Sequence, residues 1–359
     1  MDFESIASTI PPLGRVDFVY WRRNCKGIQK SRYIKYYTYL RTIMEENVFV
    51  VYDRNVEDLA LTLAPGRPAY PITADEDHKT IDSVMDICRW LLSQGADRNA
   101  LVYAVGGGVT TDLVGFAASI YKRGVRYVNY PTTLLCQVDA GLGGKTGCNL
   151  DSYKNMIGVI AFPEQTRILP QALRTLPERE LRSGAAEMLK SFIIEDLGGY
   201  YEKAVALLSA PEMDFDALGE LVLAASEVKR RVVEKDPYEK NIRRYLNLGH
   251  TYAHAIEWYQ HTHPTACPMT HGEAVSVGMV CAARLSEALG VCEKGLAAKI
   301  EADLKACRLP VELPCPESEL EAALWKDKKA ESGKIHFVLI EKIGKVTIKD
   351  LDDLHQYSE

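Results

Sequence analysis

The sequence predicts an α/β N-terminal domain followed by a mostly α-helical C-terminal domain, with the boundary near residues 165–175. Up to about residue 131, short apolar runs alternate with helical patterns, which is typical of a parallel sheet covered by helices. From about residue 170, long amphipathic helical patterns replace these runs. The 359 residues are enough for two cores of ordinary size.

Three short runs rich in β-branched and aromatic residues predict the strands of the first domain. They are NVFVVYD at 47–53, ALVYAVGG at 100–107 and VRYVNYP at 125–131. Between the first two, residues 78–95 predict a helix that stops at Gly95. Its apolar residues at helical spacing are Ile81, Val84, Met85, Cys88 and Leu92.

The second half contains two clear amphipathic helices and one hairpin. Residues 213–236 carry a single apolar stripe made of Leu218, Leu221, Val222, Ala225, Val228 and Val232. Residues 271–290 carry another, made of Val277, Cys281, Ala282 and Leu285. Near the end, IHFVLIEKIGKVTI at 335–348 predicts a β-hairpin.

Composition and charge exclude several function classes. A formal net charge of -6 argues against a general nucleic-acid binder, so we interpret the basic, aromatic stretch at 21–37 as the solvated face of an amphipathic helix. No apolar run approaches the roughly 18 residues that span a bilayer, and the N-terminus lacks the pattern of a secretory signal. The nine scattered cysteines form no CxxC pair and suggest buried free thiols in a reducing compartment. We therefore expect a cytoplasmic protein.

A glycine-rich turn is the first candidate binding element. AVGGGVTTDLVGFAAS at 104–119 places Gly106, Gly107 and Gly108 between a predicted strand and a helix. This arrangement suits a diphosphate at the helix N-terminus, and it equally suits a tight turn with close packing. Asp53 and Asn55, after the first strand, lie where ribose hydroxyls are often bound. The pair Glu76 and Lys79 is expected either to touch the same ligand or to pair internally.

A second group of residues suggests a metal site. In RSGAAEMLKSFIIED, Glu187 and Lys190 share one helical face amid apolar residues, either as a salt bridge at a helix edge or as functional groups. His250 and His254 lie one helical turn apart, and His271 begins another helix. Glu187 with two of these three histidines would fit a catalytic divalent metal. The sequence has no HExxH motif, so a metalloprotease has no support.

Cationic and amide side chains recur beside these elements. Such a group indicates a small polyanionic substrate that carries a phosphate and a carboxylate. The residues concerned are Arg123, Lys145, Lys154, Asn155, Lys190, Lys229 and Arg243.

Taken together, the motifs resemble the 3-dehydroquinate synthase family over about residues 47 to 350. GGGVTTDLVGFAAS, YKRGVRYVNYPTTLLCQVDAGLGGKTGCN, KNMIG, TLPEREL, AEMLK, LNLGHTYAHAIE, HGEAVSVGM and DKK occur in the family's order. The resemblance implies a Rossmann-like NAD-binding domain (1–170), a helical metal- and substrate-binding domain (171–359), a divalent metal that is usually zinc, with cobalt possible, and a homodimer. It also implies conversion of 3-deoxy-arabino-heptulosonate 7-phosphate to 3-dehydroquinate and phosphate in the shikimate pathway, by transient NAD oxidation, phosphate elimination, reduction, ring opening and aldol closure.

The resemblance also implies roles for individual residues. Metal ligands would be Glu187, His250 and His271. NAD contacts would be Asp53, Asn55, Glu76, Lys79, Gly106, Gly107, Gly108, Asp112, Thr132, Thr133, Lys154 and Thr175. Substrate contacts would be Asp139, Lys145, Asn155, Lys190, Lys229, Arg243, Asn247, His254 and Lys328 or Lys329, with Arg123 reaching the neighbouring subunit's site. The catalytic residues would be Lys145, Lys190, Glu239 and His254, with acid–base roles for the last two.

Some features depart from the family pattern, and related activities remain as alternatives. The long loop after His250 contains His261 and His263, which we expect to be surface residues, and Pro237 stands where an acidic residue is more common. Glycerol-dehydrogenase-like enzymes share the architecture but need fewer anion-binding groups. Other sugar phosphate cyclases are closer alternatives, and those whose substrates lack a carboxylate should not need Arg243 with Asn247 and His254.

Overall fold

The computed structural model describes residues 47–151, 153–320 and 335–351. The described residues all belong to one compact unit, which begins at Asn47. The helix expected at 21–37 and the lysines Lys328 and Lys329 lie outside the described residues.

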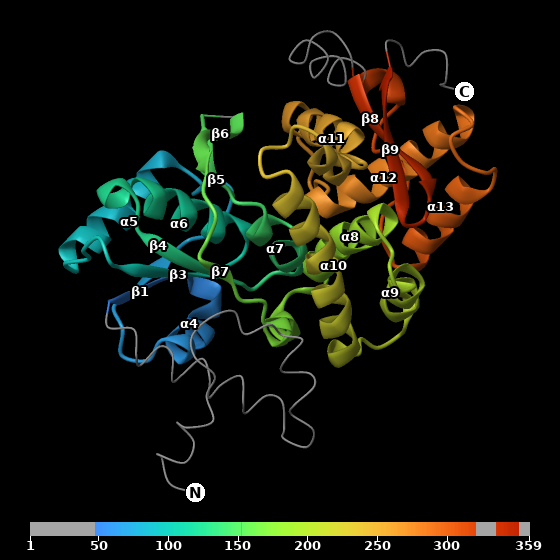
Figure 1. The fold of residues 1–359 in the computed structure, drawn as a ribbon. Coiled ribbons are helices and arrows are strands. Elements are labelled where there is room, and N and C mark those ends of the chain that lie inside the picture. The colour runs from blue at the N-terminus through green and yellow to red at the C-terminus, as the bar shows by residue number, and fades with distance from the viewer. Residues whose placement is uncertain (1–46, 152, 321–334, 352–359) are drawn as a thin grey trace, which may run out of the picture. The chain divides into compact units, whose positions relative to one another are not determined.

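A five-stranded parallel sheet forms the first half of this unit (Figure 1). Its order is β2-β1-β3-β4-β7, with every neighbouring pair parallel. The three predicted strands are confirmed as β1 (Val48–Asp53), β3 (Leu101–Gly106) and β4 (Arg126–Pro131). The two edge strands, β2 (Ala69–Ile72) and β7 (Gln165–Thr166), were not predicted because they are too short to show a pattern.

Helices cover the sheet, and the predicted helix before β3 turns a different face to the core than expected. α4 (Glu57–Leu63) contacts β1, while α6 (Gly108–Ile120) packs on β3 and β4 with α5 (Ile81–Ser93) beside it (Figure 1). α5 buries Val84, Ile87 and Leu91. The expected stripe was wrong in part, because Ile81, Met85 and Leu92 are exposed and Leu92 is 64% exposed. The apolar residues of α5 lie on several of its faces, so their spacing alone did not identify the face that packs against α6.

An antiparallel hairpin that was not predicted lies between β4 and β7 in the chain. It consists of β5 (Lys145–Leu150) and β6 (Tyr153–Ile160), and it follows the short helix α7 (Leu134–Val138). Almost every residue of β6 is exposed, and its sequence mixes Lys, Asn and Gly with apolar residues. A strand without a buried face lacks the alternation that reveals strands in sequence.

The second half is mostly helical, which confirms the predicted fold class. Its elements are α8 (Glu178–Ile194), α9 (Tyr200–Ser209), α10 (Phe215–Lys235), α11 (His250–Thr262), α12 (His271–Ala288), α13 (Leu296–Ala306) and the hairpin of β8 (Ile335–Lys342) and β9 (Lys345–Leu351), with 3-10 turns η4 (Pro170–Thr175) and η5 (Ile242–Asn247). The predicted apolar stripe of α10 is buried throughout, and the terminal hairpin is confirmed. The domain boundary at 170/171 stays a prediction.

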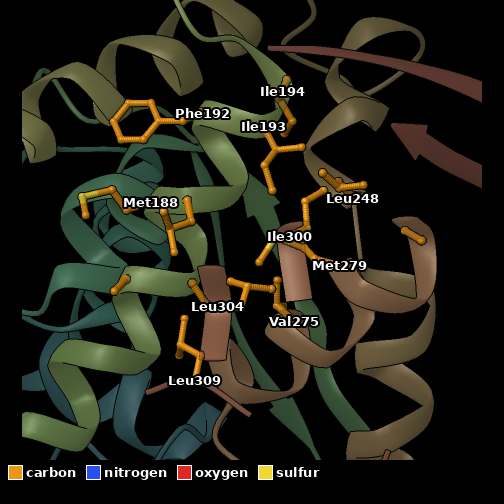
Figure 2. Packing of buried hydrophobic residues seen from close by; sticks show 14 of the residues in the cluster. Met188, Phe192, Ile193, Ile194, Leu248, Val275, Met279, Ile300, Leu304 and Leu309 are labelled. Atoms are coloured by element: carbon orange, nitrogen blue, oxygen red, sulfur yellow. The ribbon is translucent and has the colours of Figure 1, made fainter. Parts of the chain in front are cut away.

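The core of the helical half is built around α8. Figure 2 shows side chains of α8, α12 and α13 meeting there, among them Met188, Val275, Met279, Ile300 and Leu304. From Ser183 to Ile194, every residue of α8 is buried. A helix that is enclosed on all sides offers a rigid support for polar groups placed on it.

The eight described cysteines are free thiols, in line with the absence of CxxC pairs. Three of them, Cys136, Cys148 and Cys307, are buried, and Cys267 is exposed. Among the described helices, none combines the length and apolarity needed to cross a bilayer.

Two glycines hold the start of α11 against α12. Gly249 has a φ of 77° and precedes the helix, so it adopts a left-handed conformation that side chains disfavour. A Cβ added to Gly278 of α12 would lie 2.0 Å from the Gly249 carbonyl oxygen. This backbone-to-backbone contact therefore sets the position of His250, the first residue of α11.

We predict that Gly278→Ala lowers the free energy of unfolding by about 1–3 kcal/mol, because overpacking outweighs the better helix propensity of alanine. Urea unfolding would measure the change. Gly219→Ala in α10 is the matched control, since its Cβ would come no closer than 3.2 Å to Pro170. Equal stabilities for the two variants would contradict the proposed contact.

Candidate functional site

The carboxyl ends of β1, β3 and β4 bring predicted cofactor residues to one edge of the sheet. Asp53 ends β1, Gly106 ends β3 and Thr132 follows β4. The amide of Thr132 donates to the Gly106 carbonyl at 2.9 Å. Asp53 accepts hydrogen bonds from the backbone and side chain of Asn55, both at 3.0 Å. In open parallel sheets, this edge is where ligands bind.

The three glycines of the turn have different surroundings. A Cβ on Gly106 would lie 2.2 Å from Thr110 Oγ1, and one on Gly107 would lie 3.0 Å from Thr133 Cγ2. Gly107 is the N-cap of the 13-residue α6 and supplies no side-chain cap. Close packing thus explains Gly106, whereas the helix N-terminus beyond it retains unpaired amides that suit an anion.

A polar network links this edge to the hairpin. The buried Lys79 donates to Asp112 Oδ2 and to Asn155 Oδ1, each at 2.6 Å. Glu76 accepts from Asn149 Nδ2 at 2.8 Å, so Glu76 and Lys79 do not pair with each other. Burial raises the pKa of Asp112, and Lys79 opposes that shift. The network places Asn155, expected to contact substrate, beside the predicted cofactor residues.

The remaining predicted cofactor residues lie farther along the chain. Thr133 caps α7 by accepting from the Cys136 amide at 3.2 Å, and Thr175 donates within its own turn to Ala172 O at 3.4 Å. Arg123 is exposed in the left-handed region with φ 69°. Within the described ranges, no hydrogen bond or ion pair joins Arg123 or Thr175 to the glycine turn.

Three side chains from three helices form a cluster with the donor set of a catalytic metal site. Ligand atoms of Glu187, His250 and His271 lie within 4.8 Å of one another. Glu187 Oε1 is 3.3 Å from His271 Nε2 and 3.6 Å from His250 Nε2. One carboxylate and two imidazoles are ligands that zinc prefers, with a position left for substrate. Of the three candidate histidines, the structure thus brings His250 and His271 to Glu187.

Glu187 is completely buried, as is its neighbour Lys190. The two form a close ion pair inside α8, so the salt bridge expected at a helix edge exists but lies in the core. Neither carboxylate oxygen of Glu187 has a well-aligned hydrogen bond among the described groups. Burial opposes the charge, yet Lys190 and the two histidines hold the pKa of Glu187 well below its usual value.

Backbone and side-chain partners orient the two imidazoles. His250 Nδ1 lies 3.2 Å from Leu248 O, and His271 Nδ1 lies 3.4 Å from Glu257 Oε1, which turns both Nε2 atoms toward Glu187. Burial, assisted by the charge of Lys190, lowers the pKa of His250 to about 3. Burial also disfavours charge on His271, but the neighbouring carboxylates of Glu187 and Glu257 raise its pKa to about 10.

Glu257 is a site residue that the sequence reasoning missed. It lies on α11 seven residues after His250, a spacing that keeps it on the same helical face. Its carboxylate is 3.7 Å from Lys154 Nζ of β6, and this pairing connects the hairpin to the metal cluster. Partners of this kind commonly orient metal-bound histidines. The spacing was a usable signal, although many surface glutamates share it.

A second pair of charges lies close to the metal cluster. Lys229 of α10 forms a short ion pair with Asp139, and both groups interact electrostatically with Glu187 and Lys190. Burial lowers the pKa of Lys229, while Asp139 opposes that shift. The guanidinium of Arg243 donates to Gly143 O at 2.7 Å. A Cβ on Gly143 would lie 3.1 Å from Arg243 Nη2 and 3.7 Å from Lys229 Nζ, so the two cations converge there.

A third group surrounds Lys145 at the start of the hairpin. Lys145 forms a short ion pair with Glu239, whose other oxygen accepts from Asn247 Nδ2 at 3.0 Å. Burial opposes charge on Glu239, but the hydrogen bond from Lys145 and its positive charge lower the pKa of this carboxyl. These contacts join residues that are 94 positions apart in sequence.

The other histidines lie outside the metal cluster. The ring of His254 lies 5.5 Å from that of His250 in an edge-on arrangement, and its side chain is exposed. His261 and His263 are exposed, and His263 stacks on Tyr259 with ring centroids 4.3 Å apart. No metal-like group among the described residues includes these three.

Family models match most of the chain. The 3-dehydroquinate synthase N-terminal model matches residues 69–183, and the C-terminal model of the same family matches residues 184–330. A 3-dehydroquinate synthase from Dictyoglomus thermophilum is 40% identical over 83% of this chain and 82% of its own length.

Solved structures share the fold. The 2-epi-5-epi-valiolone synthase of Streptomyces hygroscopicus, solved with NAD+ and Zn2+ bound, is 29% identical, covers 86% of this chain and 87% of that one, and has a TM-score of 0.75. A 2-deoxy-scyllo-inosose synthase complexed with carbaglucose-6-phosphate, NAD+ and Co2+ is 23% identical, with a TM-score of 0.76 and coverage of 86% and 88%. This second likeness supports the fold alone.

The pKa values predict proton release when a divalent metal binds at pH 7. With a pKa of about 10, His271 is protonated in the metal-free protein, whereas His250, with a pKa of about 3, is neutral. Only the neutral imidazole ligates, so zinc binding should release about one proton. Affinity should therefore fall as the pH drops below about 10. Calorimetry in buffers of different ionisation enthalpy measures the proton count.

The variant Glu257→Gln provides a control for this prediction. It removes one of the two carboxylates that raise the pKa of His271, so fewer protons should be released at pH 7 to 8. Unchanged proton release in this variant, or none in the wild type, would contradict the electrostatic account of the cluster.

Proposed function

The chain belongs to the 3-dehydroquinate synthase family, and we propose that it converts 3-deoxy-arabino-heptulosonate 7-phosphate to 3-dehydroquinate and phosphate. This reaction is a phosphate-eliminating cyclisation, the work of a carbon–oxygen lyase, and belongs to the shikimate pathway of aromatic amino acid biosynthesis. The observation that carries the proposal is the Glu187–His250–His271 cluster flanked by two separate cation groups.

The cluster fits a divalent metal, for which we propose zinc. Both oxygens of the buried Glu187 lack a well-aligned partner, and the two imidazole Nε2 atoms point at the same carboxylate. Cobalt suits the same donor set. When bound, such a metal supplies Lewis acidity that eases removal of a proton from a substrate hydroxyl. Glu187, His250 and His271 would hold it.

The glycine turn fits the diphosphate of NAD. Its glycines have no side chains that would keep a diphosphate away from the backbone. The helix α6 begins there with backbone amides that have no side-chain cap. Asp53 lies at the neighbouring strand end, where it can accept hydrogen bonds from ribose. When bound, NAD removes a hydride from the substrate and later returns it, so the reaction has no net redox change. We propose the sequence-predicted cofactor set for this role, with Lys79 and Asp112 holding the adjacent network.

The two cation groups suit the two anionic ends of the substrate. Lys229 and Arg243 converge at Gly143 close to the metal cluster, and we assign them to the carboxylate. Lys145 and Asn247 surround Glu239, and we assign them with His254, Asn155 and the lysine at 328 or 329 to the phosphate. In the protein itself, Asp139 pairs with Lys229 and Glu239 pairs with Lys145. The anionic groups of the substrate would replace these two carboxylates.

Glu239 and His254 are the proposed proton carriers. Glu239 is a carboxylate at neutral pH and can accept a proton, and a phosphate that took its place beside Lys145 would remove the contact that lowers its pKa and its basicity. The exposed His254 stands beside His250, within reach of the same substrate region. Lys190, paired with Glu187, would orient a substrate hydroxyl near the metal ligands.

The carboxylate-binding pair separates this activity from its nearest alternatives. Glycerol-dehydrogenase-like enzymes oxidise simple alcohols and have no use for two cations at Gly143. Cyclases whose substrates lack a carboxylate have no use for them either. The pairing of Lys229 with Arg243 at that point therefore favours the dehydroquinate reaction.

We further propose a homodimer that works in the cytoplasm, with Arg123 reaching the partner's site. The exposure of Arg123, and the absence of a described ion pair on it, support this role. The free thiols support a reducing compartment. Light scattering on the purified protein tests the assembly, and a monomeric mass would rule it out.

The proposed reaction predicts phosphate release from 3-deoxy-arabino-heptulosonate 7-phosphate with catalytic NAD. Release should stop after chelation and return with zinc, and NADH should not accumulate because the hydride is returned. Glu187→Gln should lose metal binding and turnover together, since the buried carboxylate is central to the cluster. Phosphate detection, absorbance at the NADH band and product identification measure these outcomes.

Two outcomes would contradict the proposal. Full turnover by the metal-free protein would exclude the assigned metal role. Accumulation of NADH with glycerol, with no phosphate release from the sugar acid, would place the chain with the alcohol dehydrogenases.

A further inference from the structure

One buried carboxylate organises the loop between α10 and η5. Asp236 is the residue that follows α10, and its side chain is 7% exposed. Oδ1 accepts from the amide of Lys240 at 3.0 Å, while Oδ2 accepts from the amides of Asn241 at 2.6 Å and Arg243 at 3.1 Å. Three backbone amides therefore converge on a single side chain.

This loop carries two residues of the proposed substrate site. Glu239 has a φ of 58°, a left-handed conformation that a glutamate adopts only when its surroundings impose it. From there its carboxylate reaches Lys145 and Asn247. Arg243 is the second residue of η5, directly after the loop, and its guanidinium donates to Pro237 O at 2.5 Å and to Gly143 O at 2.7 Å.

We propose that Asp236 is a positioning residue that sets Glu239 and Arg243 in register with Lys145 and Gly143. The proposal rests on the proposed function, because it gives those two residues their tasks. Asp236 does not itself touch a ligand in this scheme. It acts by holding the backbone between its own position and Arg243 in one conformation.

The geometry requires a carboxylate rather than an amide. Both oxygens accept hydrogen bonds from backbone N–H groups. In an Asn side chain, the NH2 group would therefore face a backbone N–H in either orientation. Asp236→Asn keeps one accepting oxygen and loses the other, while Asp236→Ala loses both. Pro237 has no backbone N–H and cannot donate a hydrogen bond in this turn. The turn therefore depends on the amides of the later residues that Asp236 accepts from.

Hydrogen exchange tests the positioning without requiring turnover. Asp236→Asn and Asp236→Ala should accelerate exchange in peptides covering residues 238–244, with peptides of α8 unchanged. Asp214→Ala is the matched control, since Asp214 caps the other end of α10 by accepting from the amides of Asp216 and Ala217. It should affect only its own end of the helix. Unchanged exchange at 238–244 in both Asp236 variants would overturn the proposal.

Kinetics then test whether the positioning serves Glu239. Asp236→Asn should lower kcat/KM by on the order of 10²-fold, the scale of a misplaced reacting group. In a Glu239→Gln background the same change should have a smaller effect, because one of the two residues that Asp236 positions is already lost. The Asp214→Ala variant should stay within about twofold in either background. Equal effects of Asp236→Asn in both backgrounds would overturn the proposal.

The two experiments separate this inference from the proposed function. If the wild-type chain releases no phosphate, the assigned reaction is wrong. The exchange measurement still decides whether Asp236 holds the loop, since it needs no substrate.

Discussion

The buried ion pair of Glu187 and Lys190 is the constraint on which the rest of the site depends. Both side chains are almost completely enclosed, and neither would be stable there as an isolated charge. Their attraction is strong in such surroundings, yet it leaves the carboxylate oxygens without well-aligned partners. His250 and His271 complete the environment from two further helices, so α8, α11 and α12 must be packed in one arrangement. The Gly249–Gly278 contact is part of that arrangement.

The same principle extends outward from the metal cluster. Two of the cations assigned to substrate have a counterion supplied by the protein, Asp139 for Lys229 and Glu239 for Lys145. Without a counterion, burial and the neighbouring positive charges would lower the pKa of such a cation, or the cation would destabilise the local packing. Asp139 opposes the lowering of the Lys229 pKa by burial, and Glu239 pairs with Lys145; in the proposed function both carboxylates would be exchanged for a substrate carboxylate or phosphate. The site is thus arranged for anions before any anion arrives.

The sequence predicted the parts of the fold with a clear burial pattern, either a single buried stripe or a continuous buried apolar run. The α10 stripe and the strands β1, β3 and β4 are of this kind. The sequence did not identify the buried face of α5, because apolar residues lie on several faces of this helix. It also did not predict the hairpin of β5 and β6, which has little buried surface. For the site, spacing indicated a carboxylate with two of three histidines, and only tertiary packing distinguishes His271 from His254. Glu257 escaped notice because many surface glutamates share its spacing from a histidine, and Asp236 because its partners are backbone amides, which have no pattern in sequence.

The general and the specific parts of this site belong to different layers of the structure. A glycine turn at the carboxyl edge of a parallel sheet suits many nucleotide cofactors, and a cluster of one carboxylate and two imidazoles suits many metal-dependent reactions. Fold and cluster alone would therefore leave the alcohol dehydrogenases as candidates. The distinction comes from Lys229 and Arg243 meeting at Gly143, where α10, η5 and the segment before β5 converge. In the proposed function, specificity thus depends on contacts between the two halves of the chain, which come from Lys229 of α10 and from the segment held by Asp236.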